Sequence, residues 1–568
     1  MAGDNKSNAS SGAEAMVRLL ALHGVKHVFG LCGDTSLPFY DALQRLNHGM
    51  THILTRDERS AAYMADAYAR VSGRAGVCEC PSGGGATYIL PGLVEASESS
   101  YSVLGITTDI STRSRGRYAL TELDQQSLFR PLTKWNGSIE HADRLPAMVR
   151  AAFRAMTTGR PGAAHLAFPF DVQKDAVPEE EIWADPQFGR YPALPSAPDP
   201  AAVTAAVDEL LAAKRPIVVC GGGVVIAGGE GELQSLAESL DIPVATTVSG
   251  QGSLAENHPN CLGVVGSNGG VPATRRLVEE ADLVFFVGCR AGSVTTERWR
   301  HPKPGTKILH LDSDPQVIGA NYPTAVALAG DARLGLAAVC RELATRGAAT
   351  VSFGGGDRVM AARREKEDAF AALAASDELP IRPERLIATM QDLLPEDAVI
   401  VADPGTPCPY LSAHYEQRRP GRHFISNRAH GALGYSLAAA VGAHYGRPGA
   451  KVVAMMGDGS FGFTSGELET VVRLGLPITM IVVSNACYGW IKAGQKSGFG
   501  GRYFSVDFSR TDHAGVAAAY GVKSWQVEDP ARLKRALAAA LDHGGPSLLD
   551  VICQPLQEAA APVSEWVA

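Results

Sequence analysis

The feature that most constrains the fold is a regular alternation of short strand-like patterns with helical patterns along most of the 568 residues. In such an alternation a helix joins each strand to the next, so neighbouring strands run parallel and helices cover the sheet. The chain is also too long for one hydrophobic core. It is therefore expected to form several α/β domains.

Two stretches that look like linkers divide this pattern. One is rich in proline and acidic residues (177–200), and the other is rich in glycine (346–358) and is followed by a charged helical pattern. The expected domains are residues 1–185, 196–345 and 375–555. The predicted fold class is α/β, with three Rossmann-like or flavodoxin-like domains built on parallel sheets. The polar N-terminal residues predict a tail before a helix that begins near Gly12.

Composition argues against several classes of function. The net charge is −8 and no basic stretch is interleaved with aromatic residues, which argues against nucleic-acid binding. No apolar run reaches ~18 residues and no signal-peptide core is evident, so a membrane span is not expected. The ten cysteines are scattered apart from Cys78 and Cys80, which indicates reduced thiols in a cytoplasmic protein rather than a zinc site.

The most informative segment is a predicted strand–helix–strand unit near the C-terminus. "AKVVAMM" predicts a buried strand that ends at Gly457, and "PITMIVVS" predicts a second strand that ends at Ser484. Between them, "TSGE" (464–467) predicts a capping box for a helix that ends before Gly475. The right-handed crossover makes the two strands parallel.

A carboxylate and a carboxamide follow the two strands of this unit. Asp458 and Asn485 lie just past the carboxyl ends, where open α/β sheets bind ligands. One carboxylate is too few for a tight calcium site but suits Mg²⁺, which takes further ligands from water and phosphate. Flanking glycines expose backbone N–H groups to phosphates. The alternative is a plain βαβ unit with polar turns, which the combined spacing of these features does not favour.

This segment resembles the diphosphate-binding signature of thiamine diphosphate (ThDP) enzymes, specifically the group of acetolactate synthases, benzoylformate decarboxylases and 2-oxo acid decarboxylases. The signature is GDG, a spacer of this length and usually two asparagines. Ser484 replaces the first asparagine and Asn485 matches the second. The resemblance implies Mg²⁺ held by Asp458, Asn485 and the backbone carbonyl of Cys487.

The resemblance extends to "THILTRDERS" (51–60) in the first domain. Asp57 replaces the family's histidine, and Glu58 matches its glutamate. The resemblance implies that Glu58 binds the aminopyrimidine ring of the cofactor and promotes deprotonation of the thiazolium carbon. Such a carboxyl group needs an apolar setting that raises its pKa. Outside this stretch, a surface or capping role would be the ordinary interpretation.

The resemblance implies further cofactor contacts in the third domain. The Gly431 carbonyl would accept from the cofactor's amino group, and Leu433 would support the bent cofactor, with core packing as its alternative. The complete set of implied cofactor-binding residues is Glu58, Gly405, Thr406, Gly431, Leu433, Gly457, Asp458, Gly459, Ser460, Asn485, Cys487, Tyr488 and Gly489. The family's sites form between subunits, which implies a homodimer at minimum and commonly a homotetramer.

Three positions bear on catalysis and on the substrate pocket. Asp34 stands where pyruvate decarboxylase-like enzymes carry an acidic proton-relay residue, although "GD" before a helix is also an N-cap pattern. Trp490 and Ile491 are expected to line the substrate pocket. Lys492 is a candidate for attracting an anionic substrate or relaying a proton, and the alternative is a lysine that faces solvent.

Two departures argue against a true acetolactate synthase. Gly494 stands where those enzymes carry a tryptophan that selects the acceptor, and "CRAGSVTTERW" (289–299) stands where they bind FAD. FAD is therefore doubtful. In the central domain, "GGGVVIAGG" departs from the GxGxxG pattern, so a bound dinucleotide is not expected either.

These observations lead to a first hypothesis and two alternatives. We predict a ThDP- and Mg²⁺-dependent carbon–carbon lyase or carboligase that decarboxylates a 2-oxo acid and releases or transfers the aldehyde unit. The second hypothesis is a 2-hydroxyacyl-CoA lyase or an oxalyl-CoA decarboxylase-like enzyme. Its adenine nucleotide or CoA would lie near Asp312 and the basic stretch 298–307. The third is a non-catalytic ThDP-binding paralogue, which the presence of Glu58, Asp458 and Asn485 argues against.

Overall fold

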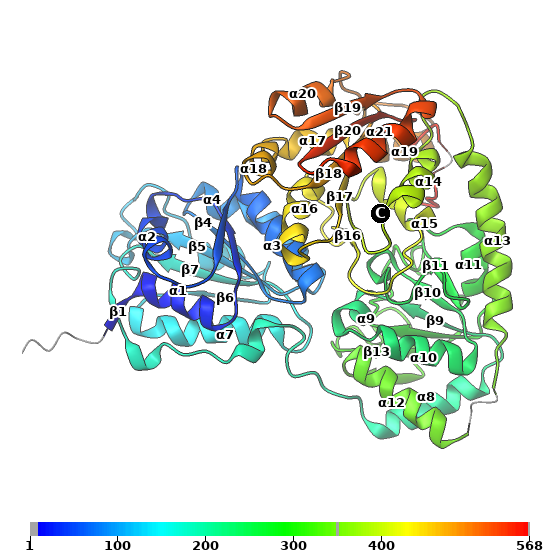
Figure 1. Ribbon diagram of the computed structural model, residues 1–568. Coiled ribbons are helices and arrows are strands. Elements are labelled where there is room, and N and C mark those ends of the chain that lie inside the picture. Colours follow the sequence, from blue (N-terminus) through cyan, green and yellow to red (C-terminus); the bar gives the residue numbers. More distant parts are fainter. Residues whose placement is uncertain (1–8, 348–350, 560, 566–568) are drawn as a thin grey trace, which may run out of the picture. The chain divides into compact units, whose positions relative to one another are not determined.

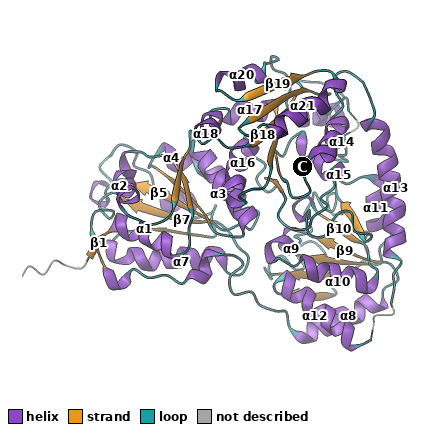
Figure 2. Cartoon of the chain, in the orientation of Figure 1, coloured by secondary structure: helices purple, strands orange, loops and turns teal. Residues whose placement is uncertain are grey.

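The computed structural model describes residues 9–347, 351–559 and 561–565 (Figure 1). The described residues divide into two compact units. The first comprises those of Met1–Leu194, Ala429–Ala432 and Ala438–Pro448, and the second comprises those of Pro195–Arg428, Leu433–Leu437 and Gly449–Ala568. Together they contain three parallel six-stranded sheets with helices packed on them (Figure 2). The predicted α/β fold with three parallel sheets is confirmed.

The sheet of the first unit has the strand order β3-β2-β4-β5-β7-β6, and every neighbouring pair is parallel. Its strands are β2 (His27–Gly30), β3 (Thr51–Leu54), β4 (Gly76–Cys80), β5 (Val103–Asp109), β6 (Trp135–Ser138) and β7 (Ala164–Pro169). Three of the four inner strands, β4, β5 and β7, are buried along their whole length, as expected when helices cover both faces of a parallel sheet.

Seven α-helices accompany this sheet: α1 (Gly12–Leu22), α2 (Leu37–Arg45), α3 (Glu58–Ser72), α4 (Gly84–Tyr88), α5 (Leu90–Glu98), α6 (Gln125–Phe129) and α7 (Leu145–Thr157). Helix α3 has a defined cap at each end. Asp57 accepts a hydrogen bond from the N–H of Arg59, and Gly73 ends the helix with a φ of 66°. These caps fix the position at which β3 passes into α3, directly beside Glu58.

The central sheet of the second unit has the order β11-β10-β9-β12-β13-β14. Its strands are β9 (Pro216–Cys220), β10 (Val244–Thr246), β11 (Cys261–Val264), β12 (Leu283–Val287), β13 (Lys307–Asp312) and β14 (Val326–Ala329), and all neighbours are parallel. Its helices are α8 (Pro200–Ala212), α9 (Gly222–Ala227), α10 (Glu230–Leu240), α11 (Pro272–Glu279) and α12 (Ala332–Thr345).

The third sheet, also in the second unit, has the parallel order β16-β15-β17-β18-β20-β19. Its strands are β15 (Val399–Ala402), β16 (Phe424–Ser426), β17 (Val452–Gly457), β18 (Ile478–Ser484), β19 (Lys523–Val527) and β20 (Ser547–Ile552). Its helices are α14 (Pro383–Leu393), α15 (Pro407–His414), α17 (Asp458–Thr464), α18 (Glu467–Arg473), α19 (Gly489–Gly498), α20 (His513–Ala519) and α21 (Pro530–Asp542). Helix α16 (Tyr435–Gly446) begins in the second unit and belongs to the first unit from Ala438 onward.

Helix α13 (Gly355–Ala374) links the two sheets of the second unit. It contacts α11 of the central sheet and α14 of the third, and Figure 1 shows it running beside both. The charged helical pattern after the second expected linker is therefore confirmed as a helix. Residues 348–350 of that linker lie outside the described residues. Among the helices described, none combines the length and apolar character needed to cross a bilayer.

Two local expectations are wrong. The capping box at 464–467 is absent, because the Thr464 hydroxyl donates to the carbonyl of Gly434 and α18 begins after Gly466 without a side-chain cap. Regular secondary structure also begins before the predicted helix, within the segment predicted as a tail. Ala9–Ser11 forms β1, which pairs antiparallel with β8 (Ala176–Pro178), and residues 1–8 lie outside the described residues.

The C-terminal half of α16 packs on α3 in the first unit at backbone distance. A Cβ atom on Gly442 would lie 1.9 Å from the carbonyl oxygen of Met64, and one on Gly446 would lie 2.4 Å from Cγ2 of Val71. The two helices can approach this closely only because glycine carries no side chain. Ala438 to Ala443 are almost fully buried in this contact region.

We expect Gly442→Ala to destabilise the protein by about 1–3 kcal/mol or more, because the added methyl group overpacks this contact. The free energy of unfolding in urea measures the effect. Gly231→Ala in α10 is the matched control, since a Cβ atom at Gly231 has open space around it. That control should be neutral or stabilising. Equal stability of the two variants would contradict the packing argument.

Candidate active site

Asp458 and Asn485 lie at the same carboxyl edge of the third sheet. Asp458 directly follows β17, and Asn485 directly follows the parallel neighbour β18. One carboxylate oxygen of Asp458 accepts hydrogen bonds from the N–H groups of Asn485 and Ala486 at 2.8 and 2.6 Å. The other oxygen accepts from Gly459 at 2.8 Å. The carboxylate therefore joins the ends of two strands, and burial raises its pKa against the opposing effect of these donors.

Glycines leave space around this carboxylate. A Cβ atom on Gly405 or Gly457 would have no protein atom within 4 Å. A Cβ atom on Gly489 would lie 3.3 Å from the Thr406 hydroxyl oxygen and 3.6 Å from the Asn485 amide nitrogen. The residues predicted at the starts of α15, α17 and α19 therefore lie at one edge of the third sheet. Open space adjoins two of them, Gly405 and Gly457.

Asp403 is a site residue that the sequence analysis missed. It follows β15, is fully buried, and accepts hydrogen bonds from the N–H groups of Tyr435 and Ser436 at 2.9 and 3.2 Å. The hydroxyls of Ser436 and Ser460 also donate to it, at 2.9 and 2.6 Å. Asp403 therefore ties α16 to α17, and burial raises its pKa. Its only signal in the sequence is an acidic residue directly after an apolar strand.

The other predicted residues of the second unit differ in exposure. The Ser460 hydroxyl accepts from the N–H of Gly434 at 2.7 Å, so its hydrogen-bonding capacity is used within the protein. Leu433 is half-buried rather than part of the core, and the thiol of Cys487 donates to the Asn485 side chain at 3.4 Å. The Tyr488 ring is 38% exposed and packs edge-on against Phe508.

Helix α19 carries the predicted substrate residues. Ile491 is 55% exposed, and Trp490 packs partly against the core of the third sheet. The ammonium group of Lys492 lies 2.6 Å from the carboxylate of Asp507, which raises the pKa of Lys492, and 5.0 Å from the centre of the Tyr503 ring. Lys492 is therefore held in an ion pair whose other partner, Asp507, was missed, and the choice between a substrate role and a solvent-facing lysine stays open.

Glu58 lies in the first unit as the first residue of α3. It is half-buried, and burial raises the pKa of its carboxyl group. A Cβ atom on Gly85 would lie 3.1 Å from a Glu58 carboxylate oxygen, so this carboxyl lies against the start of α4. Asp57, at the family's histidine position, caps α3 and pairs with Arg59 at 2.7 Å. Gly431, also in this unit, is exposed and has a φ of 74°.

Asp34 begins a 3₁₀ turn (Asp34–Ser36) after β2 and is exposed. Gly33 is the N-cap residue of this turn and no side chain caps it, so the capping interpretation of Asp34 is wrong. The next residue is held firmly. The Thr35 hydroxyl lies 2.8 Å from that of Thr108 and 3.2 Å from that of Ser82, which joins the turn to the ends of β4 and β5.

Glu79 is a second missed carboxyl group in the first unit. It lies in β4 and is completely buried, and burial raises its pKa to about 8. The hydroxyls of Ser36 and Tyr40 donate to it at 2.5 and 2.8 Å, and the Tyr40 hydroxyl also lies 2.9 Å from Nε2 of His52. The signal in the sequence was the single acidic residue inside the apolar strand "GVCEC".

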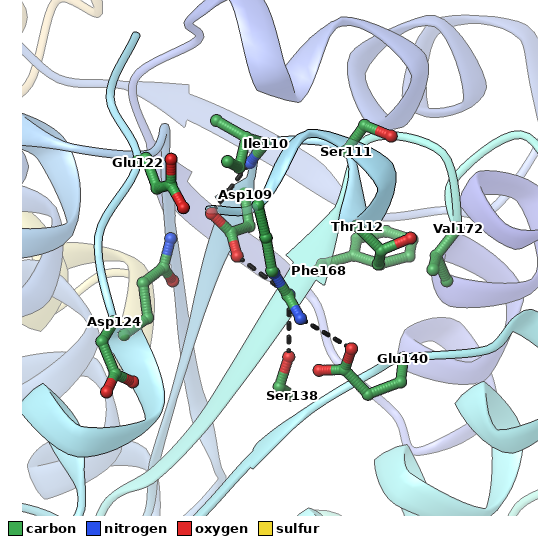
Figure 3. A network of polar contacts seen from close by, with 12 residues as sticks. Asp109, Ile110, Ser111, Thr112, Glu122, Asp124, Ser138, Glu140, Phe168 and Val172 are labelled. Atoms are coloured by element: carbon green, nitrogen blue, oxygen red, sulfur yellow. Dashed lines mark hydrogen bonds and ion pairs between the residues drawn. The ribbon is translucent and has the colours of Figure 1, made fainter. Parts of the chain in front are cut away.

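The loop after β5 is fixed by a polar network in the first unit (Figure 3). The Arg115 guanidinium donates to the carboxylates of Asp109 and Glu140 at 3.2 and 2.6 Å and to the Ser138 hydroxyl at 3.2 Å. Burial raises the pKa of Asp109 in spite of Arg115. The network holds the beginning of a loop that carries the exposed Tyr118.

The carboxyl edge of the central sheet is occupied by the chain itself. A Cβ atom on Gly221 would lie 2.2 Å from the carbonyl oxygen of Gly288, so the glycines after β9 serve backbone packing. The C-terminal residues 561–565 reach the same sheet, where the Gly269 N–H donates to the Pro562 carbonyl at 2.9 Å. The Asp312 carboxylate accepts from the Asp314 N–H at 2.9 Å, which matches the structural-turn interpretation of Asp312. The prediction that this domain lacks a dinucleotide stays a prediction.

Three family models match the chain in order along the sequence. They describe the N-terminal TPP-binding domain (residues 10–128), the central domain (203–339) and the C-terminal TPP-binding domain (403–551) of thiamine pyrophosphate enzymes. Thiamine pyrophosphate is another name for ThDP. Each matched segment covers strands of one sheet: the central match spans all six strands of its sheet, the N-terminal match ends before β6 and β7, and the C-terminal match begins just after β15.

Individual relatives assign the chain to a narrower group of these enzymes. It is 34% identical to the probable acetolactate synthase large subunit of Methanocaldococcus jannaschii, over 96% of this chain and 92% of that protein. It is 30% identical to the acetolactate synthase isozyme 3 large subunit of Escherichia coli K12, over 94% of this chain and 92% of that protein. The chain belongs to the ThDP-dependent enzymes and, within them, to the acetolactate synthase group.

We expect Asp403→Asn to weaken ThDP binding about tenfold and to lower stability by about 1–3 kcal/mol, because an amide cannot accept all four hydrogen bonds. ThDP titration and urea unfolding measure the two effects. Asp512→Asn is the matched control, since this exposed aspartate caps α20 and asparagine caps equally well. An Asp403→Asn variant with wild-type ThDP binding and stability would contradict the role of Asp403 in holding α16 and α17 together.

The buried Glu79 predicts a pH-dependent stability. The folded protein keeps this proton up to about pH 8, whereas the unfolded chain loses it near its ordinary value of 4.5. The stability that protonated Glu79 contributes is therefore fully present below the pKa of the unfolded chain. It is lost as pH rises from that pKa to the pKa of the folded protein, at about 1.4 kcal/mol per pH unit. Urea unfolding of the wild type and of Glu79→Gln across the window should show the variant gaining relative stability as pH rises. A constant difference would contradict the assignment.

Proposed function

We propose that this chain is a ThDP- and Mg²⁺-dependent carbon–carbon lyase or carboligase that decarboxylates a 2-oxo acid and releases or transfers the resulting aldehyde unit. The observation that carries the proposal is the edge of the third sheet at which Asp458 and Asn485 meet. The proposal is supported by membership of the acetolactate synthase group, to which the large subunits from M. jannaschii and E. coli belong by name.

The residues at this edge fit a magnesium diphosphate. Asp458 supplies a buried carboxylate, Asn485 a carboxamide and Cys487 a backbone carbonyl, which are the hard oxygen ligands that Mg²⁺ takes beside phosphate oxygens. The open positions at Gly405 and Gly457 give a diphosphate room to approach the backbone. Asp458 would then replace some of its present hydrogen bonds with a bond to the cation. The positive charge would stabilise the ionised form of this carboxyl group, whose pKa is raised by burial.

Glu58 is proposed to donate a proton to the cofactor's aminopyrimidine ring. The raised pKa that burial gives its carboxyl is what a proton donor working near neutral pH requires. When bound, ThDP supplies a nucleophilic carbon that accepts the electrons of the cleaved bond. This chain's residues then position the substrate, and Asp34 is proposed to relay protons from its exposed place in the first unit.

Substrate selection is proposed to lie on α19. Lys492 would attract the carboxylate of a 2-oxo acid, and Asp507 would hold its ammonium group in position. Trp490 and Ile491 would provide the apolar wall. Gly494 in this helix replaces the tryptophan of acetolactate synthases, which supports an acceptor different from theirs.

The CoA alternative has less support. Arg298 and Arg300, from the basic stretch assigned to a nucleotide, both pair with the carboxylate of Glu565. We further propose a homodimer at minimum, and commonly a homotetramer, in the cytoplasm. Each active site would then combine Glu58 of one subunit with Asp458 of another.

The decisive test of the reaction is a substrate panel with purified protein, ThDP and Mg²⁺. Small 2-oxo acids, alone or with aldehyde and 2-oxo acid acceptors, are compared with 2-hydroxyacyl-CoA and oxalyl-CoA thioesters. We expect CO₂ release from 2-oxo acids. Turnover of thioesters alone would overturn the proposal.

Glu58→Gln should lower kcat by about 100-fold or more, because it removes the ionisable proton, while ThDP still binds. Steady-state rates and a separate ThDP titration distinguish the two effects. Glu342→Gln on α12 is the control, since the Glu342 carboxylate forms an (i, i+4) surface ion pair with Arg346 in the central domain. Retained turnover in Glu58→Gln would remove this residue from the mechanism.

A further inference from the structure

Three buried polar side chains of the second unit form a cluster directly before the turn to which the proposed function assigns Mg²⁺. Ser484 ends β18, His513 begins α20 and Asp550 lies in β20, and none of them is more than 6% exposed. The Ser484 hydroxyl donates to one Asp550 carboxylate oxygen and lies 3.0 Å from Nδ1 of His513. The N–H of His513 donates to the other Asp550 oxygen at 3.2 Å. The proposed function gives these three residues no task.

The hydrogen bonds of this cluster run in one direction. Burial acts to raise the pKa of Asp550, but the hydrogen bonds that it accepts lower its pKa overall, so this carboxyl group is an ionised acceptor. The Ser484 hydroxyl has a single hydrogen and directs it to Asp550. Its oxygen therefore accepts from Nδ1–H of His513, whether the ring is neutral or charged. Donation thus passes from His513 through Ser484 to Asp550.

The cluster adjoins both elements that carry the proposed metal ligands. Ser484 directly precedes Asn485, so its side chain anchors the backbone at the point where the chain leaves β18. The His513 ring lies edge-on against the Phe461 ring, with the ring centres 5.3 Å apart. Phe461 is a buried residue of α17, the helix that begins at Asp458. His513 therefore contacts both the strand that precedes Asn485 and the helix that follows Asp458.

The turn formed by residues 485–487 has a backbone that needs support from its surroundings. Ala486 has a φ of 55°, in the left-handed region that strains a residue with a side chain. Asp458 holds this turn by accepting from two of its N–H groups. Ser484 holds the point at which the turn begins. A shift of Ser484 would therefore displace the Asn485 side chain and the Cys487 carbonyl together.

We propose that Ser484, His513 and Asp550 are positioning residues that hold the turn of residues 485–487 in the conformation that binds Mg²⁺, and that the cluster requires the donor at Nδ1 of His513. Side chains that are hydrogen-bonded behind metal ligands commonly set metal affinity in this way. The effect on Mg²⁺ rests on the proposed function. The effect on the turn is a property of the chain without metal or cofactor.

Hydrogen exchange of the full chain without ThDP or Mg²⁺ tests the hold on the turn. Mass spectrometry follows a peptide that covers residues 485–488, and β12 in the same sample reports global opening. Ser484→Ala removes the link. Ser524→Ala is the matched control, because the Ser524 hydroxyl donates to the Ala514 carbonyl at 2.8 Å and also holds α20. We expect exchange of the turn at least about tenfold faster in Ser484→Ala and unchanged in Ser524→Ala, with β12 unchanged in both.

His513→Asn and His513→Leu test the requirement for a donor. The two new side chains are similar in size and both lose the ring contact with Phe461, but only asparagine has an N–H group near the place of Nδ1. Calorimetry with ThDP present measures the affinity for Mg²⁺. We expect this affinity to be about tenfold weaker in His513→Leu and within about threefold of the wild type in His513→Asn.

The outcomes separate the cluster from the proposed function. Equal exchange of the turn in Ser484→Ala and Ser524→Ala would overturn the positioning role, and this pair decides it even if the His513 variants do not fold. Equal Mg²⁺ affinity in the two His513 variants would overturn the requirement for the donor. A wild-type protein whose ThDP binding does not respond to Mg²⁺ would overturn the proposed metal site, and the exchange result would still decide whether the cluster holds the turn.

Discussion

The Asp458 carboxylate that bridges the ends of β17 and β18 is the interaction on which the rest of the account depends. Parallel strands bring their carboxyl ends to one edge, and a side chain there can bind the backbone of the neighbouring loop. Asp458 uses three N–H groups to do so. This arrangement fixes Asn485 beside it and leaves open space at Gly457, which is where we propose that a cation and a diphosphate bind.

Buried carboxyl groups also lie in or directly after strands of the first and third sheets. Asp403 organises the third sheet with four hydrogen bonds, and Glu79 lies inside the first sheet with two. Removing such groups from water raises their pKa values, and donors from neighbouring loops limit the rise. Both carboxyl groups therefore have pKa values raised by burial. These groups also lower the free energy of unfolding at high pH, because a buried carboxyl group destabilises the folded protein once it ionises.

Sequence patterns predicted the parts of the structure that local rules determine. Strand–helix alternation gave the three parallel sheets, and the positions of Asp458 and Asn485 after two strands gave their shared edge. Asp403, Glu79 and Asp507 were missed because their importance depends on partners far away in the sequence, such as Ser460 for Asp403 and Tyr40 for Glu79. The false capping box at Thr464 has the same cause, since a distant carbonyl takes the hydroxyl.

Calorimetric titration of ThDP into the full chain, with and without Mg²⁺, tests the role proposed for Asp458. We expect Mg²⁺ to tighten ThDP binding at least about tenfold in the wild type, because the cation would join the diphosphate to Asp458. Asp458→Asn should lose this dependence, and Asp542→Asn at the exposed end of α21 should keep it. Metal-independent binding in the wild type, or unchanged metal dependence in Asp458→Asn, would contradict the account.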